Sequence, residues 1–110
     1  MANEIHELTR EVVQFTQDRD WDQFHNPKDL AVALSIEAAE LLELYLWKSP
    51  DEAKVEKVRE ELADVLNYAI LLADKYDFDI AEIVREKMAA NALKYPVEKA
   101  KGVATKYDEL

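Results

Sequence analysis

Apolar residues recur at steps of three and four along most of the chain, which is the spacing that places side chains on one face of an α-helix. The pattern predicts four helices, which cover approximately residues 3–20, 27–47, 50–76 and 80–95, followed by a tail over 97–110. The connections between these helices are short, so consecutive helices are expected to run antiparallel. The sequence therefore predicts an all-α fold, a single domain over residues 1–110 with an antiparallel four-helix-bundle-like architecture.

Residues typical of helix ends support these boundaries. An Asn, Ser or Asp before a helix accepts hydrogen bonds from free backbone N–H groups of the first turn, and Pro is favoured at the first helical position. The expected starts are Asn3, Asn26–Pro27, Ser49 with Glu52, and Asp79 with Glu82. Pro96 is expected to end the fourth helix, and the tail beyond it is expected to be extended.

The second predicted helix is unusual because nearly every side of it is apolar. Between Leu30 and Trp47, its only charged residues are Glu37, Glu40 and Glu43. A helix that is hydrophobic all round is normally buried, and a carboxylate is rarely buried unless it is paired or bound to a metal. This apolar surface exceeds what one small chain can cover, so the sequence predicts a homodimer or a homotetramer.

The charge balance restricts the partners of the protein. The 110 residues carry a formal net charge of −10, which argues against a nucleic-acid-binding surface, because such surfaces neutralise phosphates with basic residues. The sequence has no Cys, no basic-then-apolar signal segment and no uninterrupted apolar run long enough to span a membrane. These features predict a cytoplasmic protein that binds neither nucleic acid nor membranes.

Two pairs of acidic residues carry the candidate chemistry. Glu37 and Glu40 share a face of the second helix, and Glu61 and Asp64 share a face of the third, in both cases beside apolar positions. Two antiparallel helices would bring these four carboxylates together, where they repel one another and raise each other's pKa unless a cation intervenes. Oxygen ligands without His or Cys suit Mg²⁺, with Mn²⁺ as a substitute. The four acids are therefore the predicted metal ligands.

Two other interpretations of these acids are weaker. Solvated faces are the commonest use of such acidic pairs, but the second helix has no Lys or Arg among its acids. A di-iron carboxylate bundle needs Glu-x-x-His pairs, and neither His6 nor His25 follows a Glu at that spacing. The pattern therefore favours a magnesium site.

Polar residues on the fourth helix are candidates for phosphate binding. Lys87, Asn91 and Lys94 follow one another at spacings of four and three, so they can share one face. A Lys contacts phosphate as a point charge, and an Asn can bond phosphate or sugar oxygens. The alternative is that these side chains are solvated on the surface.

Aromatic residues are candidates for binding a nucleobase. Trp21 and Phe24 lie in the loop before the second helix, Trp47 lies at that helix's end, and Tyr68 lies beyond the second acidic pair. Stacking on such rings contributes about 1–3 kcal/mol per base, although core burial is the commoner role of these residues. His25 either forms hydrogen bonds within its loop or contacts the ligand.

Together these residues resemble the MazG-type all-α nucleoside triphosphate pyrophosphohydrolases, and most closely their dCTP pyrophosphatase branch. The family pattern of a Glu-x-x-Glu pair on one helix and a Glu-x-x-Asp pair on the next is matched by Glu37 with Glu40 and by Glu61 with Asp64. The other matching segments are RDWDQFHNPKDL, LYLWK, EELADVLNY, KMAANALKYP and KYDEL. The resemblance therefore extends over nearly the whole chain from Arg19 onward.

The resemblance implies hydrolysis of a nucleoside triphosphate to the monophosphate and pyrophosphate. The substrate that it implies is dCTP or another pyrimidine deoxynucleoside triphosphate, standard or modified. It also implies that the acids bind Mg²⁺, that the site lies near a subunit interface, and that Trp21, Trp47 and Tyr68 surround the base. Val12 and Phe15 stand on the first-helix side of this base pocket. Two alternatives stay open, namely a related all-α pyrophosphohydrolase of another nucleotide and a non-catalytic helical oligomer that acts as a scaffold.

A hydrolytic mechanism follows from the charges. Because the triphosphate and the acids are both anionic, a metal must bridge them, and a metal-bound water would attack phosphorus. Glu37 or Glu40 is expected to accept the proton of this water, and the residues do not decide between the two. Lys87 is expected to hold the phosphates. The four acids are thus the predicted catalytic residues as well as the metal ligands.

Overall fold

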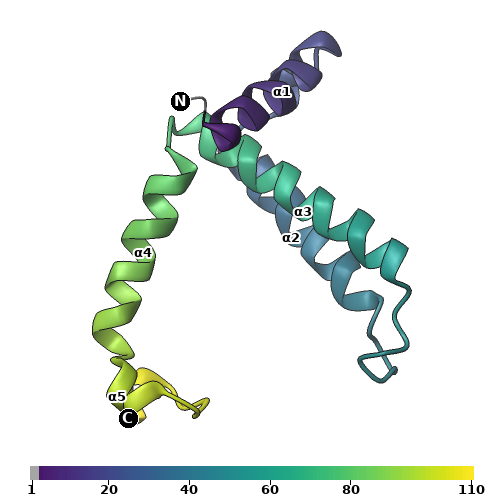
Figure 1. Cartoon of the computed structure of the whole chain (residues 1–110). Helices are drawn as coiled ribbons and strands as arrows, with labels where there is room; N and C mark the ends of the chain where they lie inside the picture. Colours follow the sequence, from purple (N-terminus) through teal and green to yellow (C-terminus); the bar gives the residue numbers. More distant parts are fainter. Residues whose placement is uncertain (1–2) are drawn as a thin grey trace. The chain divides into compact units, whose positions relative to one another are not determined.

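The computed structural model describes residues 3–110, and its regular elements in this range are all helical. The prediction of an all-α fold is thereby confirmed. The elements are α1 (Glu4–Asp18), η1 (Asp22–Phe24), α2 (Pro27–Glu43), α3 (Val55–Lys75), α4 (Ile80–Lys94), α5 (Val97–Ala100) and η2 (Tyr107–Glu109), as Figure 1 shows. The described residues form two compact units, 3–78 and 79–110, which are described separately.

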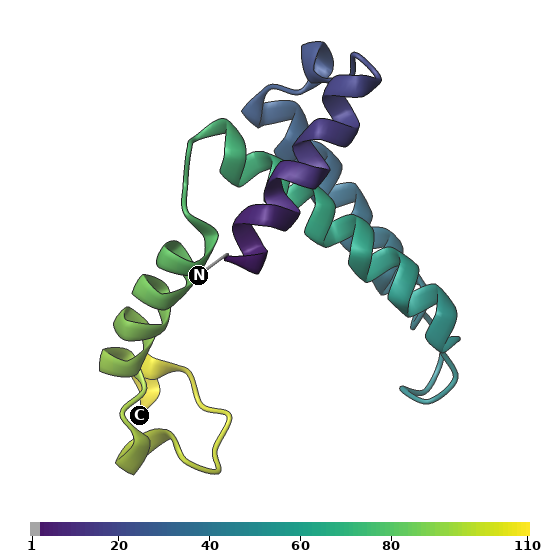
Figure 2. The same ribbon diagram turned by 45° about the horizontal axis from the view of Figure 1, so that its top comes forward.

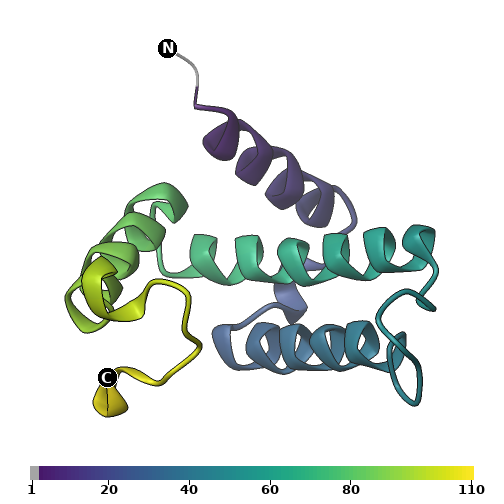
Figure 3. The same ribbon diagram turned by 60° about the horizontal axis from the view of Figure 1, so that its bottom comes forward.

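The first unit is built on α2 and α3, which lie side by side and run in opposite directions (Figure 3). The helix α1 lies against α3 (Figure 2). Leu30 is the most completely buried side chain, with 1% of its surface exposed, and Ile70, Leu71 and Ala73 of α3 join it in the core. The antiparallel arrangement predicted for these two consecutive helices is present in this unit.

Three of the predicted helix starts are confirmed by their hydrogen bonds. The Asn3 side chain accepts from the backbone N–H groups of Ile5 and His6. The Asn26 side-chain oxygen Oδ1 accepts from the Asp29 N–H at 2.8 Å, with Pro27 at the first helical position. The carboxylate of Asp79 accepts from the Glu82 N–H at 2.9 Å. These caps satisfy N–H groups that have no partner inside the helix.

The connection between α2 and α3 differs from the prediction. The helix α2 ends at Glu43 rather than Trp47, and α3 begins at Val55 rather than near Pro50. The expected capping box is wrong because the Ser49 hydroxyl donates to the carboxylates of Asp51 and Glu52 instead of accepting from a backbone N–H. A local pairing of side chains thus competes with helix formation here.

Aspartates replace glycine at two helix ends. Asp20 and Asp77 adopt the left-handed conformation, with φ of 58° and 56°. In each case the following residue closes the helix by a long backbone bond, Trp21 N–H to the Thr16 carbonyl and Phe78 N–H to the Ala73 carbonyl, both at 2.9 Å. This is the Schellman arrangement, in which Asp is tolerated because its short polar side chain suits that region.

The second unit contains α4, α5 and the C-terminal residues. The prediction of an extended tail is wrong, because α5 and η2 form short helical turns within it. The ring of Tyr107 lies edge-on to that of Tyr95, with centroids 6.0 Å apart, and the Lys94 ammonium lies 4.8 Å from the centroid of the Tyr107 ring. These contacts hold the end of the chain against the end of α4.

Two further observations concern the exposed side chains of α4 and the apolar character of the helices. Ile83, Val84 and Met88 of α4, which the periodicity predicts to face inward, are exposed in the single chain. None of the helices described over residues 3–110 has the length and apolar character that crossing a membrane requires.

Candidate active site

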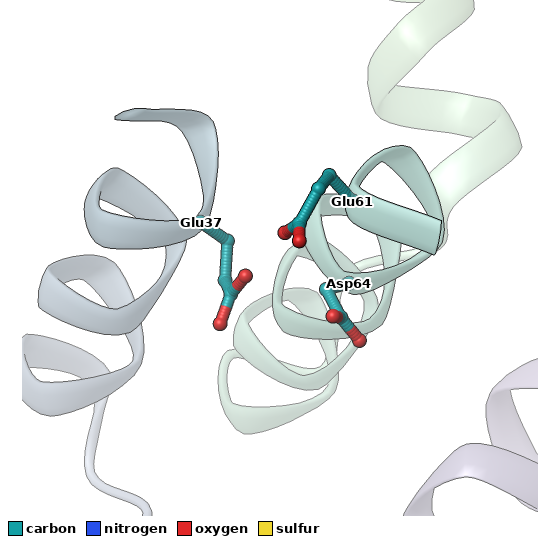
Figure 4. A group of neighbouring side chains, drawn as sticks. All are labelled: Glu37, Glu61 and Asp64. Atoms are coloured by element: carbon teal, nitrogen blue, oxygen red, sulfur yellow. The ribbon is translucent and has the colours of Figure 1, made fainter. Parts of the chain in front are cut away.

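Three of the four predicted metal-binding acids meet between α2 and α3. One carboxylate oxygen from each of Glu37, Glu61 and Asp64 lies within 4.8 Å of the other two. Figure 4 shows Glu37 and Glu61 pointing toward one another from the two helices, with Asp64 beside them. Glu40, one turn along α2, is outside this group of three but acts electrostatically on both Glu37 and Glu61. We call Glu37, Glu40, Glu61 and Asp64 the acidic cluster.

The electrostatics of the acidic cluster are those of crowded carboxylates. Burial, followed by interactions with Glu40, Asp64 and Glu61, raises the pKa of Glu37 from its ordinary value of 4.5 to about 7. Burial, followed by the charge of Glu40, also raises the pKa of Glu61. Both directions mean that the folded chain disfavours the charged form of these groups.

The acidic cluster fits a hard divalent cation. The Oε2 atoms of Glu37 and Glu61 are buried and have no hydrogen-bond partner among the described residues. Buried polar atoms are normally satisfied, so these two oxygens need a partner from outside the chain. The donors are all carboxylate oxygens, which is the ligand set that Mg²⁺ and Mn²⁺ prefer.

A cavity of about 340 Å³ lies next to the acidic cluster, and Asp64 belongs to both. Its lining residues come from α1, the loop before α2, and α3: Val12, Phe15, Thr16, Trp21, His25, Asp64, Asn67, Tyr68 and Leu71. The structure therefore gathers Trp21, His25 and Tyr68, which the sequence predicts as substrate-binding residues. Val12 and Phe15 form the α1 side of the cavity, as the resemblance to the MazG-type family implies. The volume lies at the lower end of the range for small-molecule sites.

The aromatic wall of the cavity is fixed by local contacts. Trp21 packs edge-to-face on Phe15, with ring centroids 5.8 Å apart and an interplanar angle of 68°. The guanidinium of Arg19 lies 3.6 Å from the centroid of the Phe15 ring. The Schellman turn at the end of α1 sets where Trp21 leaves the helix. These contacts place Trp21 against the end of α1.

Polar groups in the cavity differ in their availability. The Thr16 hydroxyl is buried and donates to the Val13 carbonyl at 2.7 Å. The Nδ1 atom of His25 is buried without a partner among the described residues. Asn67 lies three residues after Asp64 and carries both a donor and an acceptor. His25 therefore has unused hydrogen-bonding capacity in the cavity, and Asn67 adds an amide to its lining.

Four predicted substrate-binding residues lie elsewhere. Trp47 is 97% exposed in the turn after α2 and does not line the cavity. Lys87, Asn91 and Lys94 belong to α4 in the second unit, where the two lysines are exposed and Asn91 is half-buried. The roles of these four residues stay predictions.

Three lining residues were not foreseen. Thr16, Asn67 and Leu71 contribute to the cavity without having been singled out from the sequence. Asn67 and Leu71 follow Asp64 at spacings of three and seven, which keeps them on one side of α3. That spacing is a signal from which both residues could have been found, whereas Thr16 depends on how α1 lies against α3.

Comparisons with known proteins agree with the geometry. The sequence matches the MazG-like family over residues 32–110. It is 38% identical to dCTP pyrophosphatase 1 of Mus musculus and 36% identical to that of Homo sapiens, in both cases over 114 aligned positions that cover 96% of this chain and 67% of the relative. The structure is similar to that of a pyrophosphatase from Archaeoglobus fulgidus, with a TM-score of 0.81 and 40% identity, covering 87% of this chain and 95% of the other.

Proposed function

The chain belongs to the MazG-like family and is a dCTP diphosphatase-like nucleoside triphosphate pyrophosphohydrolase, and we propose that dCTP or another pyrimidine deoxynucleoside triphosphate, standard or modified, is its substrate. The products are the monophosphate and pyrophosphate. The observation that carries this proposal is that Asp64 belongs to both the acidic cluster and the aromatic cavity. A nucleotide that spans the two places its phosphates at the acids and its base among the aromatic rings.

We assign Mg²⁺ to the acidic cluster, with Mn²⁺ as a substitute. Glu37, Glu61 and Asp64 would hold it, with Glu40 as a fourth carboxylate within reach of the same charges. When bound, the ion neutralises phosphate charge and acidifies a water molecule. The support for this assignment is the pair of buried, unpartnered carboxylate oxygens of Glu37 and Glu61.

The remaining chemistry belongs to the side chains of the chain. A general base must lie within hydrogen-bonding reach of the water whose proton it removes, and a carboxylate of the acidic cluster that the metal does not fully engage could fill this role. Glu37 or Glu40 accepts the proton of the attacking water. We also propose that Lys87, Asn91 and Lys94 bind phosphate as hydrogen-bond donors, as their spacing on one face of α4 predicts.

The base is recognised in the cavity. Trp21 and Tyr68 supply aromatic surface for stacking, which is worth about 1–3 kcal/mol. His25 and Asn67 supply hydrogen bonds to the edge of the base or to the sugar. The volume of about 340 Å³ is sufficient for a nucleobase, and the preference for a pyrimidine is supported by the similarity to dCTP pyrophosphatase 1.

The active form is a homodimer or a homotetramer with the site near a subunit interface. Val32, Ile36 and Leu42 of α2 are exposed in the single chain, and an apolar patch of this kind marks an association surface. Trp47 adds support, because a bulky residue with φ of 62° is strained and is also 97% exposed. A neighbouring subunit would bury the side chain of Trp47.

The decisive experiment measures pyrophosphate release from a panel of standard and modified nucleoside triphosphates, with and without Mg²⁺. The expected result is Mg²⁺-dependent release of equimolar monophosphate and pyrophosphate, with pyrimidine deoxynucleotides preferred. Purine preference would contradict the substrate assignment. Full activity in the presence of a chelator would contradict the metal assignment. Asp64→Asn serves as the inactive control, and Glu43→Gln as the active one, since Glu43 is exposed and outside the acidic cluster.

A further inference from the structure

The loop between α1 and α2 carries two side chains of the cavity. Trp21 and His25 both line it, and Asp22 lies between them in the sequence. The carboxylate of Asp22 accepts a hydrogen bond from the Lys75 ammonium, with Nζ and Oδ1 2.8 Å apart. Lys75 lies in the last turn of α3, 53 residues away along the chain. The ion pair therefore ties a cavity-forming loop to a core helix.

Apart from the packing of Trp21 on Phe15, the loop has few other constraints. Its backbone bonds are local, from Trp21 N–H to Thr16, from Phe24 N–H to Trp21, and from His25 N–H to Asp22 at 3.0 Å. Among the side-chain hydrogen bonds and ion pairs described for residues 3–110, the bond from Lys75 is the one that joins this loop to α3. Asp22 thus accepts two hydrogen bonds, one at its carboxylate from Lys75 and one at its backbone carbonyl from the N–H of His25.

The helix α3 carries residues of the acidic cluster, the cavity and the ion pair in order along one face. Asp64, Tyr68, Leu71 and Lys75 follow one another at steps of four, three and four, which keeps them on one side of a helix. The first residue belongs to the acidic cluster, the next two line the cavity, and Lys75 anchors the loop that closes it. One rigid helix therefore sets the distance between the acids and the aromatic wall.

The ion pair is more constrained than an ordinary surface pair. The Lys75 side chain is only 24% exposed, whereas Asp22 is 52% exposed. The hydrogen bond and charge of Lys75 hold the pKa of Asp22 below its usual range. By contrast, Lys57 and Glu60 of the same helix are 3.7 Å apart, with both side chains at least 60% exposed.

We propose that Lys75 is a positioning residue for nucleotide binding. Through Asp22 it holds the loop that carries Trp21 and His25 against the cavity, so that both side chains are in place before the base arrives. Lys75 does not itself contact the substrate. The effect on substrate rests on the proposed function of the cavity as the base site, while the effect on the loop does not.

The test compares Lys75→Met with Lys57→Met, which removes the exposed ion pair of the same helix. We expect Lys75→Met to raise the KM for dCTP by about three- to fivefold, the upper part of the range expected for losing one partly exposed ion pair, while kcat changes less than about twofold. Lys75→Arg restores the wild-type KM because it keeps the pair. Asp22→Asn reproduces the effect of Lys75→Met, and the double variant is no worse than either single variant. Lys57→Met leaves KM unchanged.

A second readout follows the loop without any substrate. In a Trp47→Phe background, Trp21 is the remaining tryptophan of the two, so acrylamide quenching of its fluorescence reports its accessibility. Lys75→Met increases the quenching and Lys75→Arg does not. If Lys75→Met destabilises the fold, Asp22→Asn and Lys75→Arg still decide the question, since Asp22 is half exposed.

Three results would overturn the proposal. In the first, the KM and the quenching constant of Lys75→Met match those of Lys57→Met. In the second, Lys75→Met lowers kcat and leaves KM unchanged. In the third, Lys75→Arg is as impaired as Lys75→Met. If the wild-type protein does not hydrolyse dCTP, the proposed function fails by itself. The quenching experiment then decides alone whether Lys75 positions the loop.

Discussion

Replacing Glu37 by Gln gives the sharpest test of the acidic cluster, because Gln keeps the shape of the side chain and removes its charge. The pKa of Glu37 is raised from 4.5 to about 7 by burial and by the neighbouring carboxylates. This increase in pKa corresponds to a free-energy penalty of about 3 kcal/mol for the charged form in the folded state, at about 1.4 kcal/mol per pKa unit. Since the carboxylate is partly solvated, screening reduces the expected value to about 1–2 kcal/mol.

The sign of the effect follows from proton linkage. An acid whose pKa is higher in the folded state than in the unfolded state makes the folded state bind more protons. Its contribution to stability is therefore lost as the pH rises from 4.5 to about 7, and stays lost above that value. Without metal, Glu37→Gln is expected to be more stable than the wild type at about pH 8, by about 4–8 °C in Tm. The difference should vanish near the unfolded pKa of 4.5.

Mg²⁺ should reverse this order. A ligand that binds only the folded state stabilises it by about 2.7 kcal/mol at a hundredfold excess over its Kd. The wild type gains this stabilisation and Glu37→Gln loses most of it, because one ligand is gone. Thermal unfolding is measured at equal protein concentration in chelator and in Mg²⁺, at about pH 5 and about pH 8.

The control for this experiment is Glu43→Gln, the same substitution on an exposed position of the same helix region. It removes one negative charge from a chain of net charge −10 and so corrects for general repulsion. Two results would refute the reasoning. One is a Glu37→Gln variant that is no more stable than Glu43→Gln in chelator at about pH 8, and the other is an equal Mg²⁺ shift in all three proteins.

Three further substitutions test other parts of the structure. Asp64→Asn should lower the Mg²⁺-dependent rate of pyrophosphate release by at least about a hundredfold, because this residue joins the acidic cluster and the cavity; near-normal turnover would remove it from the site. Trp21→Ala should raise the KM for dCTP by roughly tenfold, since base stacking is worth about 1–3 kcal/mol, and an unchanged KM would contradict its place in the base site. Leu30→Ala should lower the free energy of unfolding by about 2–5 kcal/mol in denaturant titrations, because Leu30 is 1% exposed, and a loss below about 1 kcal/mol would contradict its role in the core.

The helices were predictable because their signals are local. Apolar spacing located all four long helices, and Asn3, Asn26 and Asp79 cap the starts that their side chains predict. The segment between α2 and α3 was not predictable in the same way. There, Ser49 bonds to neighbouring carboxylates, and the choice between capping a helix and forming a turn depends on small energy differences.

Predicting the acidic cluster and predicting the cavity require different information. The pairing of Glu37 with Glu61 and Asp64 follows from helical spacing and from two adjacent antiparallel helices. The cavity depends on where α1 lies against α3, which brings Thr16 and Phe15 opposite Asn67. A spacing rule describes residues of one helix, so it cannot specify contacts between helices that are distant in the sequence.

The acidic cluster lowers the stability of the metal-free chain. Burial and mutual repulsion disfavour the charged form of Glu37 in the folded chain, and the described residues offer no partner for the buried oxygens of Glu37 and Glu61. Carboxylates in such a position cost stability unless a cation offsets their charge. A sequence selected for stability alone would replace at least one of them, whereas the proposed metal site uses all of them. The same repulsion that weakens the metal-free protein therefore favours cation binding, so the stability and the activity of this chain should respond to Mg²⁺ together.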